Sequence, residues 1–142
     1  MDCVCVLPAH HPLTKKKQIK AADLEGEAFV SFPLGSGPRE RIDRVLIAEG
    51  IKTRTVLESD LGASVCSLVD AGMGISVINP LAALEEQRNL DLQVRPFRPA
   101  ITVRLAILLP PDAPHSRLVA AFANHVRGVI DSALEHVRPY RR

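Results

Sequence analysis

The sequence predicts an α/β fold, in which helices pack against a sheet. One observation is a segment whose apolar residues recur at helical spacing, at Leu61, Val65, Leu68 and Val69. A second is the glycine-containing turn at residues 71–74, which leads directly into a short β-branched strand at residues 75–78. A helix that passes through such a turn into a buried strand is half of a βαβ layer.

Composition indicates a single soluble domain. The chain has 142 residues, of which 46% are hydrophobic and 24% charged, enough for a real core. No apolar run approaches the roughly 18 residues of a membrane-spanning helix, and no signal peptide is recognisable. Three cysteines, an odd number, fit a reducing cytoplasm, where we expect the protein to reside. A net charge of +2 gives no argument for nucleic-acid binding.

The first quarter of the chain alternates short strands with breaks. Residues 4–7 form an apolar strand that Pro8 ends, and residues 9–20 form a polar, exposed loop. The lysines at 15–17 could contact an anionic partner or could simply be solvated. Residues 21–24 predict a helical turn and residues 28–32 a strand.

The middle of the chain predicts a second helix and strand before the segment described first. A loop at residues 33–37 leads into a helix over residues 38–49, with Pro38 at its first position. Its buried stripe comprises Ile42, Val45 and Leu46. Gly50 closes this helix, residues 53–57 form a strand, and residues 58–60 cap the helix that follows.

The last third predicts a helical turn at residues 81–86, strands at 92–94 and 101–109, and a final helix at 118–137. The strand at 101–109 is the most apolar run of the chain. Residues 110–114 are a proline-rich break, and the basic tail at 138–142 is expected to fray. One side of the final helix is apolar, at Leu118, Phe122, Val126, Val129, Ala133 and Val137.

The glycine-rich loop that enters the first long helix is the leading candidate for a binding site. A helix N-terminus leaves backbone N–H groups unpaired, and the helix dipole favours an anion there. Ser31 and Ser36 could add hydroxyl donors beside Gly35 and Gly37. The alternative is that the glycines only make a turn and that Ser36 or Gly37 only caps the helix.

Two further polar residues lie at strand ends. Ser59 stands at a strand-to-helix junction, where it could either face a ligand or serve as a plain cap. Asn79 follows the central strand, and ligands gather at the carboxyl ends of strands in open α/β sheets.

Neither a metal site nor catalysis is expected. Cys3 and Cys5 with His10 and His11 do not have a zinc-finger spacing, and Cys66 is expected to pack as a small apolar residue. The sequence contains no G-x-S-x-G and no Walker motif, so we predict no catalytic residues, no metal and no cofactor.

Five segments resemble, in order and approximate spacing, the effector-binding domain of LysR-type transcriptional regulators. They are CVLPAHHPL at 5–13, AADLEGEAFVSF at 21–32, GSGPRERIDRVLIAEGI at 35–51, VLESD at 56–60 and LVDAGMGISVINP at 68–80. The resemblance covers residues 4–83 closely and the rest of the chain loosely. The segments FVSF and VCSLVDAGMGISVINP are most similar to members that sense amino-acid-like or opine-like compounds.

The resemblance implies a type 2 periplasmic-binding-protein-like fold, in which a small molecule binds between two lobes. Residues 13–92 would form the complete second lobe, residues 4–8 and 94–99 the two crossover strands, and residues 101–137 the C-terminal part of the first lobe. The loop at residues 31–37 and the junction at Ser59 would border the cleft. Leu7 and Pro8, in the first crossover, would line its floor.

The resemblance also sets what we expect of partners. A small carboxylate-bearing effector is expected, together with a homo-oligomer. DNA would be reached only through a winged helix-turn-helix that does not precede Met1, so operator binding by this chain is not expected. With part of the first lobe missing, residues 101–109 and the last helix should expose apolar surface.

Two other classes of function stay open from the sequence. One is a stand-alone small-molecule binding module of the same fold without a role at DNA. The other is an enzyme on an α/β scaffold, which the lack of an acid, base or thiol at residues 31–37 argues against.

Overall fold

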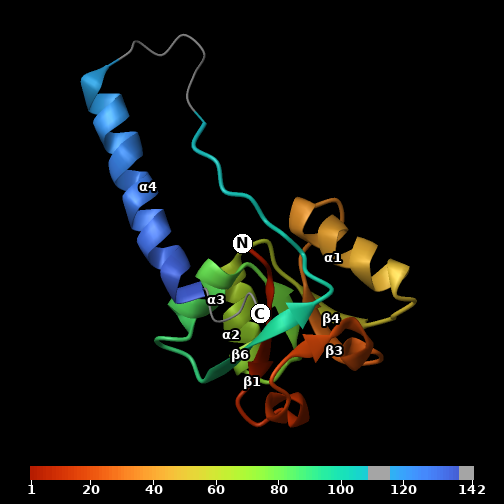
Figure 1. The fold of residues 1–142 in the computed structure, drawn as a ribbon. Coiled ribbons are helices and arrows are strands. Elements are labelled where there is room, and N and C mark those ends of the chain that lie inside the picture. Colours follow the sequence, from red (N-terminus) through yellow and green to blue (C-terminus); the bar gives the residue numbers. More distant parts are fainter. Residues whose placement is uncertain (109–115, 138–142) are drawn as a thin grey trace.

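The computed structural model describes residues 1–108 and 116–137. Its strands are β1 (Val4–Pro8), β2 (Ile19–Lys20), β3 (Ala28–Ser31), β4 (Arg54–Glu58), β5 (Ser76–Ile78) and β6 (Leu92–Arg98). Its α-helices are α1 (Gly37–Ala48), α2 (Gly62–Asp70), α3 (Pro80–Glu86) and α4 (Arg117–Val137), with short 3₁₀ helices at Pro12–Lys15 and Ala21–Leu24. The predicted α/β class is confirmed, and α4 projects away from the sheet-containing body (Figure 1).

Two antiparallel strands form the spine of the body. β1 lies between β5 and β6 in a four-stranded sheet of order β2-β6-β1-β5. Its register with β6 pairs Val4 with Pro96 at one end and Pro8 with Leu92 at the other. The side chains of β1 from Val4 to Leu7 are fully buried, which explains why this strand reads as a continuous apolar run.

A second, parallel pair joins the first sheet at a single point. β3 pairs with β4, and an isolated bridge connects Phe29 of β3 to Ile75, immediately before β5. The Val30 N–H donates to the Ile75 carbonyl at 2.9 Å, and the Ile75 N–H donates to the Ala28 carbonyl at the same distance. Consequently β5 begins at the junction of the two sheets, and its opposite end, at Val77 and Asn79, reaches the candidate site.

The start of α1 and the end of α2 follow the predicted capping chemistry, whereas the start of α2 does not. Ser36 caps α1 and Pro38 occupies its first turn, while Ala71 and Gly72, at φ +76°, end α2. The predicted cap of α2 is wrong, because Leu61 rather than residues 58–60 is the N-cap. Leu61 is also 62% exposed, and Cys66 instead completes the buried face of α2 with Val65 and Val69.

Two expectations about strands fail. The loop at residues 9–20 contains β2, whose parallel partner is the end of β6. Conversely, residues 101–108 do not form the predicted strand: only Thr102 bridges, to Asp2, and the chain then runs extended. A strand needs a neighbour to satisfy its backbone groups, and the described residues offer none beyond Val103. Leu109, the break at 110–114 and the tail at 138–142 lie outside the described residues.

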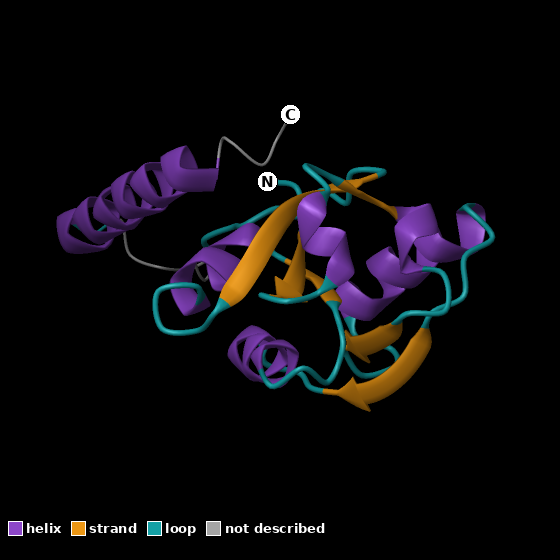
Figure 2. Cartoon of the chain, turned by 90° about the horizontal axis from the view of Figure 1, so that it is seen from below, coloured by secondary structure: helices purple, strands orange, loops and turns teal. Residues whose placement is uncertain are grey.

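The last helix stands apart from the strands, as two perpendicular views show (Figures 1 and 2). α4 covers residues 117–137, close to the predicted 118–137. Its apolar side is largely uncovered: Leu118 is 78%, Phe122 67% and Val129 57% exposed, whereas Val137 is buried. Residues 101–108 and α4 therefore carry exposed apolar surface, as expected.

Candidate functional site

A small cavity lies where β5 ends and where α1 and α2 begin. Its volume is about 180 Å³. Phe32 and Ile42 come from the β3–α1 region, Val77 from β5, and Ile101 and Val103 from the segment after β6. The remaining lining residues are Cys3, Pro38, Arg41, Asp60, Gly62 and Asn79. Two helix N-termini and a strand carboxyl end thus converge on one hollow, an arrangement common at ligand sites of α/β folds.

The loop at residues 31–37 lines the cavity through Phe32 rather than through its two serines. Ser31 ends β3 and is 1% exposed, and its carbonyl accepts a hydrogen bond from the Ser59 N–H at 3.0 Å. Gly35 adopts φ +79°, which explains the glycine in this turn. The Ser36 hydroxyl accepts from the Arg39 N–H at 3.4 Å, so it acts as the helix cap. Gly37 opens α1.

Two arginines in the first turns of α1 have different environments. The Arg39 Nη1 donates to the Phe32 carbonyl at 3.0 Å and to Glu58 Oε1 at 2.9 Å, and its Nε donates to Asp43 Oδ2 at 2.7 Å. Burial lowers the Arg39 pKa, but these carboxylate contacts outweigh burial and raise it overall. Arg39 therefore fastens α1 to the ends of β3 and β4.

Arg41 instead lines the cavity. Its guanidinium lies back over the start of α1, with Nη1 3.7 Å from the position that a Cβ would take at Gly37. No ion pair or hydrogen bond engages Arg41 within the described residues. The sequence analysis did not single it out, although its place one turn after Gly37 was a usable signal, because residues four apart share a helix face.

The α2 side of the cavity is formed by Asp60 and Gly62. A Cβ at Gly62 would lie 3.1 Å from the Ala82 side chain, so a small residue is favoured where α2 meets α3. Ser59 is half-buried, and its hydroxyl accepts from the Leu61 N–H at 3.4 Å rather than lining the cavity. Asp60, which the sequence analysis treated only as part of a cap, is the acidic group of the site.

Asn79 is the one predicted site residue that lines the cavity directly. Its side-chain Oδ1 accepts from the Ala82 N–H at 3.0 Å and so caps α3, which leaves the amide NH₂ for other partners. Cys3 lies opposite at the start of the chain, and burial raises the pKa of its thiol to about 11. At neutral pH this thiol is therefore uncharged.

Leu7 and Pro8 lie at the other end of β1 from Cys3. Leu7 lies four residue steps after Cys3, a rise of about 13 Å along a strand. The Leu7 side chain is fully buried, and the Pro8 carbonyl accepts from the His11 N–H at 3.0 Å. Neither residue lines the cavity of about 180 Å³, and their place on the floor of a cleft between two lobes stays a prediction.

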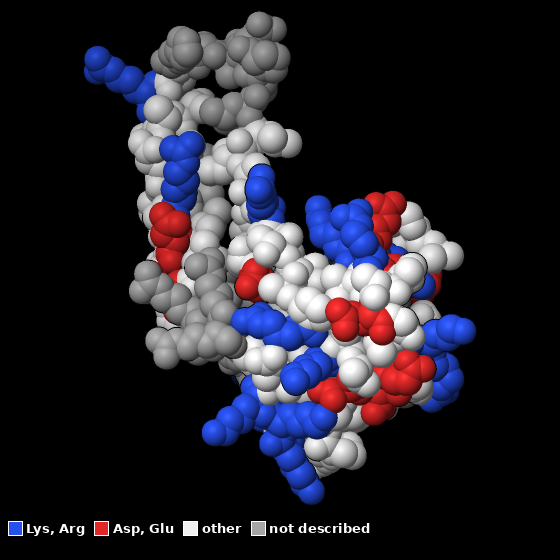
Figure 3. Space-filling model, turned by 45° about the vertical axis from the view of Figure 1, so that its right-hand side comes forward, with Lys and Arg blue, Asp and Glu red and all other residues white. Residues whose placement is uncertain are grey.

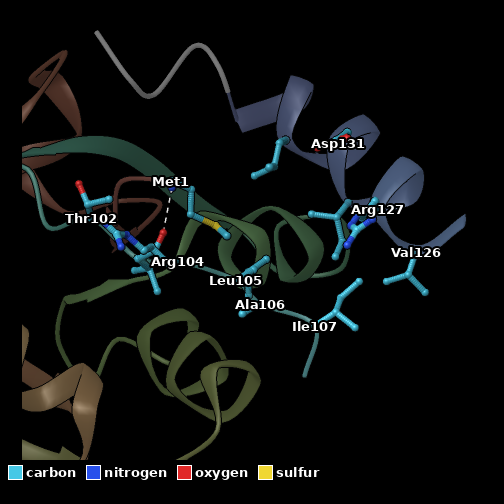
Figure 4. A pocket seen from close by; sticks show the side chains of 12 residues that line it. Met1, Thr102, Arg104, Leu105, Ala106, Ile107, Val126, Arg127 and Asp131 are labelled. Atoms are coloured by element: carbon cyan, nitrogen blue, oxygen red, sulfur yellow. Dashed lines mark hydrogen bonds between the residues drawn. The ribbon is translucent and has the colours of Figure 1, made fainter. Parts of the chain in front are cut away.

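A larger hollow, of about 720 Å³, lies between residues 102–107 and α4 (Figure 4). It is lined largely by apolar side chains, among them Leu105, Ile107, Val126 and Ile130. The Met1 amino group donates to the Val103 carbonyl at 3.0 Å at one end of it. We favour the smaller cavity as the ligand site, because charged and amide groups from separate elements converge there on apolar walls.

Outside the two hollows, we looked on the described chain for charged surfaces, metal sites and membrane-spanning helices. Acidic and basic side chains both occur on the face seen in Figure 3. In residues 1–108 and 116–137, no cluster of three His, Cys, Asp or Glu side chains could hold a metal ion. No helix within those ranges is long and apolar enough to cross a membrane.

Comparison with known proteins identifies the family. The model of the LysR substrate binding domain matches residues 2–131. The transcriptional activator protein LysR of Escherichia coli K12 is 39% identical over 127 residues, which are 89% of this chain and 40% of that protein. The regulatory protein NocR of Agrobacterium tumefaciens T37 is 37% identical over 119 residues, 84% of this chain and 39% of that protein. The chain spans about two fifths of these relatives.

Solved structures support the fold. The regulatory domain of CcmR from Synechocystis PCC6803, in complex with 2-PG, has a TM-score of 0.69 at 20% identity and covers 90% of this chain and 62% of that one. A putative LysR family transcriptional regulator from Pseudomonas aeruginosa has a TM-score of 0.73 at 16% identity. The match covers 91% of this chain and 45% of that one.

Proposed function

Because the chain belongs to the LysR substrate-binding domain family, we propose that it is the effector-sensing part of a LysR-type transcription regulator and binds a small carboxylate-bearing metabolite. The ligand would be amino-acid-like or opine-like. The observation that carries the proposal is the cavity between the N-termini of α1 and α2, where Arg41 has no protein partner within the described residues. A guanidinium beside a helix N-terminus is a strong site for a carboxylate.

The proposed division of the chain into two lobes and two crossover strands is the one expected for this family. Residues 13–92 would be the second lobe, residues 4–8 and 94–99 the crossovers, and residues 101–137 part of the first lobe. The adjacent antiparallel β1 and β6, and the separation of α4 from the body in Figure 1, support this division. The cavity then lies at the lobe boundary, since Ile101 and Val103 line it together with second-lobe residues.

Regulation would work by population shift. A ligand between lobes changes the balance of two arrangements only as far as it prefers one of them. We infer that the chain is part of a cytoplasmic homo-oligomer, which reaches DNA through a separate winged helix-turn-helix domain. We also infer that it is not an enzyme. The matched relatives named above are transcriptional regulators, which supports this assignment.

Thermal-shift screening of this chain tests the proposal. The compounds are amino acids, opines and small aromatic acids, because a ligand that binds the native state stabilises it by about 2.7 kcal/mol at a hundred times its Kd. We expect a saturable rise in melting temperature that Arg41→Gln removes and Arg44→Gln, an exposed position on the same helix, retains. A rise that is identical in both variants would contradict the proposed site.

A further inference from the structure

The cavity carries two opposite charges that do not pair with each other. Arg41 comes from α1, and Asp60 comes from the residues just before α2. Within the described residues neither side chain forms an ion pair or a hydrogen bond, although Arg39, two residues away, is fully engaged by Asp43 and Glu58. The site is thus built with one unmatched cation and one unmatched anion.

The cavity that these charges line is otherwise largely apolar and small. Phe32 lines it from the end of β3, Ile42 from α1, Val77 from β5 and Ile101 from the segment after β6. A volume of about 180 Å³ corresponds to about six water molecules at roughly 30 Å³ each, which suits a molecule of amino-acid size. Both charged side chains are solvent-accessible, so they stand at the rim and the apolar residues form the wall.

Charge complementarity then discriminates among carboxylates. A carboxylate suits Arg41, whose planar guanidinium offers paired donors. A plain carboxylic acid would offer the Asp60 carboxylate no partner, whereas a cationic group beside Asp60 would gain a charge–charge attraction. A ligand that also carries an ammonium group would satisfy both charges, and the Asn79 amide could bind a further polar atom.

We propose that Arg41 and Asp60 together select a zwitterion of the amino-acid class, with Arg41 holding the carboxylate and Asp60 the ammonium group. This inference rests on the proposed function and deepens it, because it makes the amino group of the ligand a requirement and assigns Asp60 to bind it. Asp60 is then the specificity-determining residue, because its carboxylate favours an amino acid over the same acid without its amino group.

The test compares matched ligands by titration calorimetry on the 142-residue chain. The probes are L-glutamate, L-lysine and L-leucine, each beside its counterpart without the α-amino group: glutarate, 6-aminohexanoate and 4-methylpentanoate. At least one amino acid is expected to bind at least tenfold more tightly than its counterpart. Asp60→Asn should abolish that preference by weakening the amino acid alone, whereas Arg41→Gln should weaken both.

Glu40→Gln, in the first turn of α1 but outside the cavity, is the control for Asp60→Asn and should keep the preference. Equal binding of an amino acid and its counterpart to the native chain would overturn the inference but leave the proposed function standing. A preference that survives Asp60→Asn would also overturn it. Absence of binding by all six probes would count against both.

Discussion

Gly74 lies where β3 and β5 meet, and its lack of a side chain is required there. A Cβ at this position would lie 2.4 Å from the Ala28 carbonyl oxygen and 2.8 Å from its carbonyl carbon. Both contacts are with backbone that the Ile75 N–H also binds, so the neighbour cannot yield without breaking the bridge. The sequence analysis attributed Gly74 only to a compact turn, because approach between distant segments leaves no local signal.

We expect Gly74→Ala to lower the free energy of unfolding by about 2 kcal/mol or more, as overpacking against fixed backbone does. Urea denaturation monitored by circular dichroism measures it. Gly128→Ala, in α4 with open space around the new methyl group, is the matched control and should not destabilise the chain. Equal, small effects of both substitutions would contradict the close approach.

Asp23 gives the stability of the chain a dependence on acid pH. Burial raises its pKa, but hydrogen bonds from the Lys16 side chain and the Lys20 N–H, together with their charges, outweigh burial and lower it below 3.8. A carboxylate with a lowered folded-state pKa stabilises the protein above its unfolded pKa, and this contribution is lost as the pH falls through the folded value.

Melting temperatures measured from pH 6 to pH 2.5 therefore should converge for the native chain and Asp23→Asn at the acid end, with the native chain more stable at pH 6. Asp91→Asn is a suitable control, because its carboxylate shows no hydrogen bond within the described residues. A gap between native chain and Asp23→Asn that is constant down to pH 2.5 would contradict this role.

The residues of the candidate site were only partly predictable. The glycine-rich loop, Ser59 and Asn79 pointed to the ends of β3, β4 and β5 that adjoin the cavity, because helix caps and strand ends can be recognised from the residue types. Arg41 and Asp60 were not singled out, since exposed charged residues near helix starts are common. Only the packing of α1, α2 and β5 around one cavity separates them from Arg44 or Glu40.

At the scale of elements, α1 packs on the core through Ile42 and Leu46, and one polar side chain fixes its first turn. Arg39 connects its first turn to the Phe32 carbonyl, to Asp43 and to Glu58 at the end of β4, and its side chain is 14% exposed. Since α1 supplies Arg41 and Pro38 to the cavity, this attachment sets the position of one wall.

Arg39→Met should therefore destabilise the chain by about 1–3 kcal/mol, the range expected for losing hydrogen bonds to charged groups. It should also weaken ligand binding, because the start of α1 loses its anchor. Urea denaturation and calorimetry measure the two effects, and Arg44→Met on the exposed side of α1 should show neither. Loss of binding with unchanged stability would point instead to direct ligand contact by Arg39.

Helices and strands were predictable where local sequence patterns specify them and where the described chain also supplies the neighbours that they pack against. Helices α1, α2 and α4 and strands β1, β3 and β4 follow from periodicity, caps and β-branched runs. The failure at residues 101–108 has the opposite cause: their apolar pattern is typical of a buried strand, but beyond Val103 no strand of the described chain pairs with them. Likewise β2 exists only because β6 provides an edge, which two residues of sequence cannot reveal.

At the scale of the whole molecule, the chain consists of a packed body and an apolar projection. The core residues cluster around β1, β5 and β6, whereas Leu105 and Leu108 remain 53% and 89% exposed and the apolar side of α4 is uncovered. Exposed contiguous apolar surface of this kind marks an interface or causes association.

We expect the chain to self-associate in a concentration-dependent manner, and Leu118→Ser with Phe122→Ser to reduce that association. Sedimentation velocity at several concentrations measures it. Ile47→Ser, which removes an equally exposed side chain from α1, should leave association unchanged. A monomeric native chain at all concentrations would contradict an association surface on α4.

The most direct test of the central claim is to locate the bound effector by chemical-shift mapping. The ¹⁵N-labelled chain is titrated with the compound that gives the largest saturable thermal shift. The account predicts saturable amide shifts concentrated at Arg41, Gly62, Val77 and Asn79, around the cavity. Shifts concentrated at residues 102–107 and 126–134, around the larger hollow in Figure 4, would contradict it.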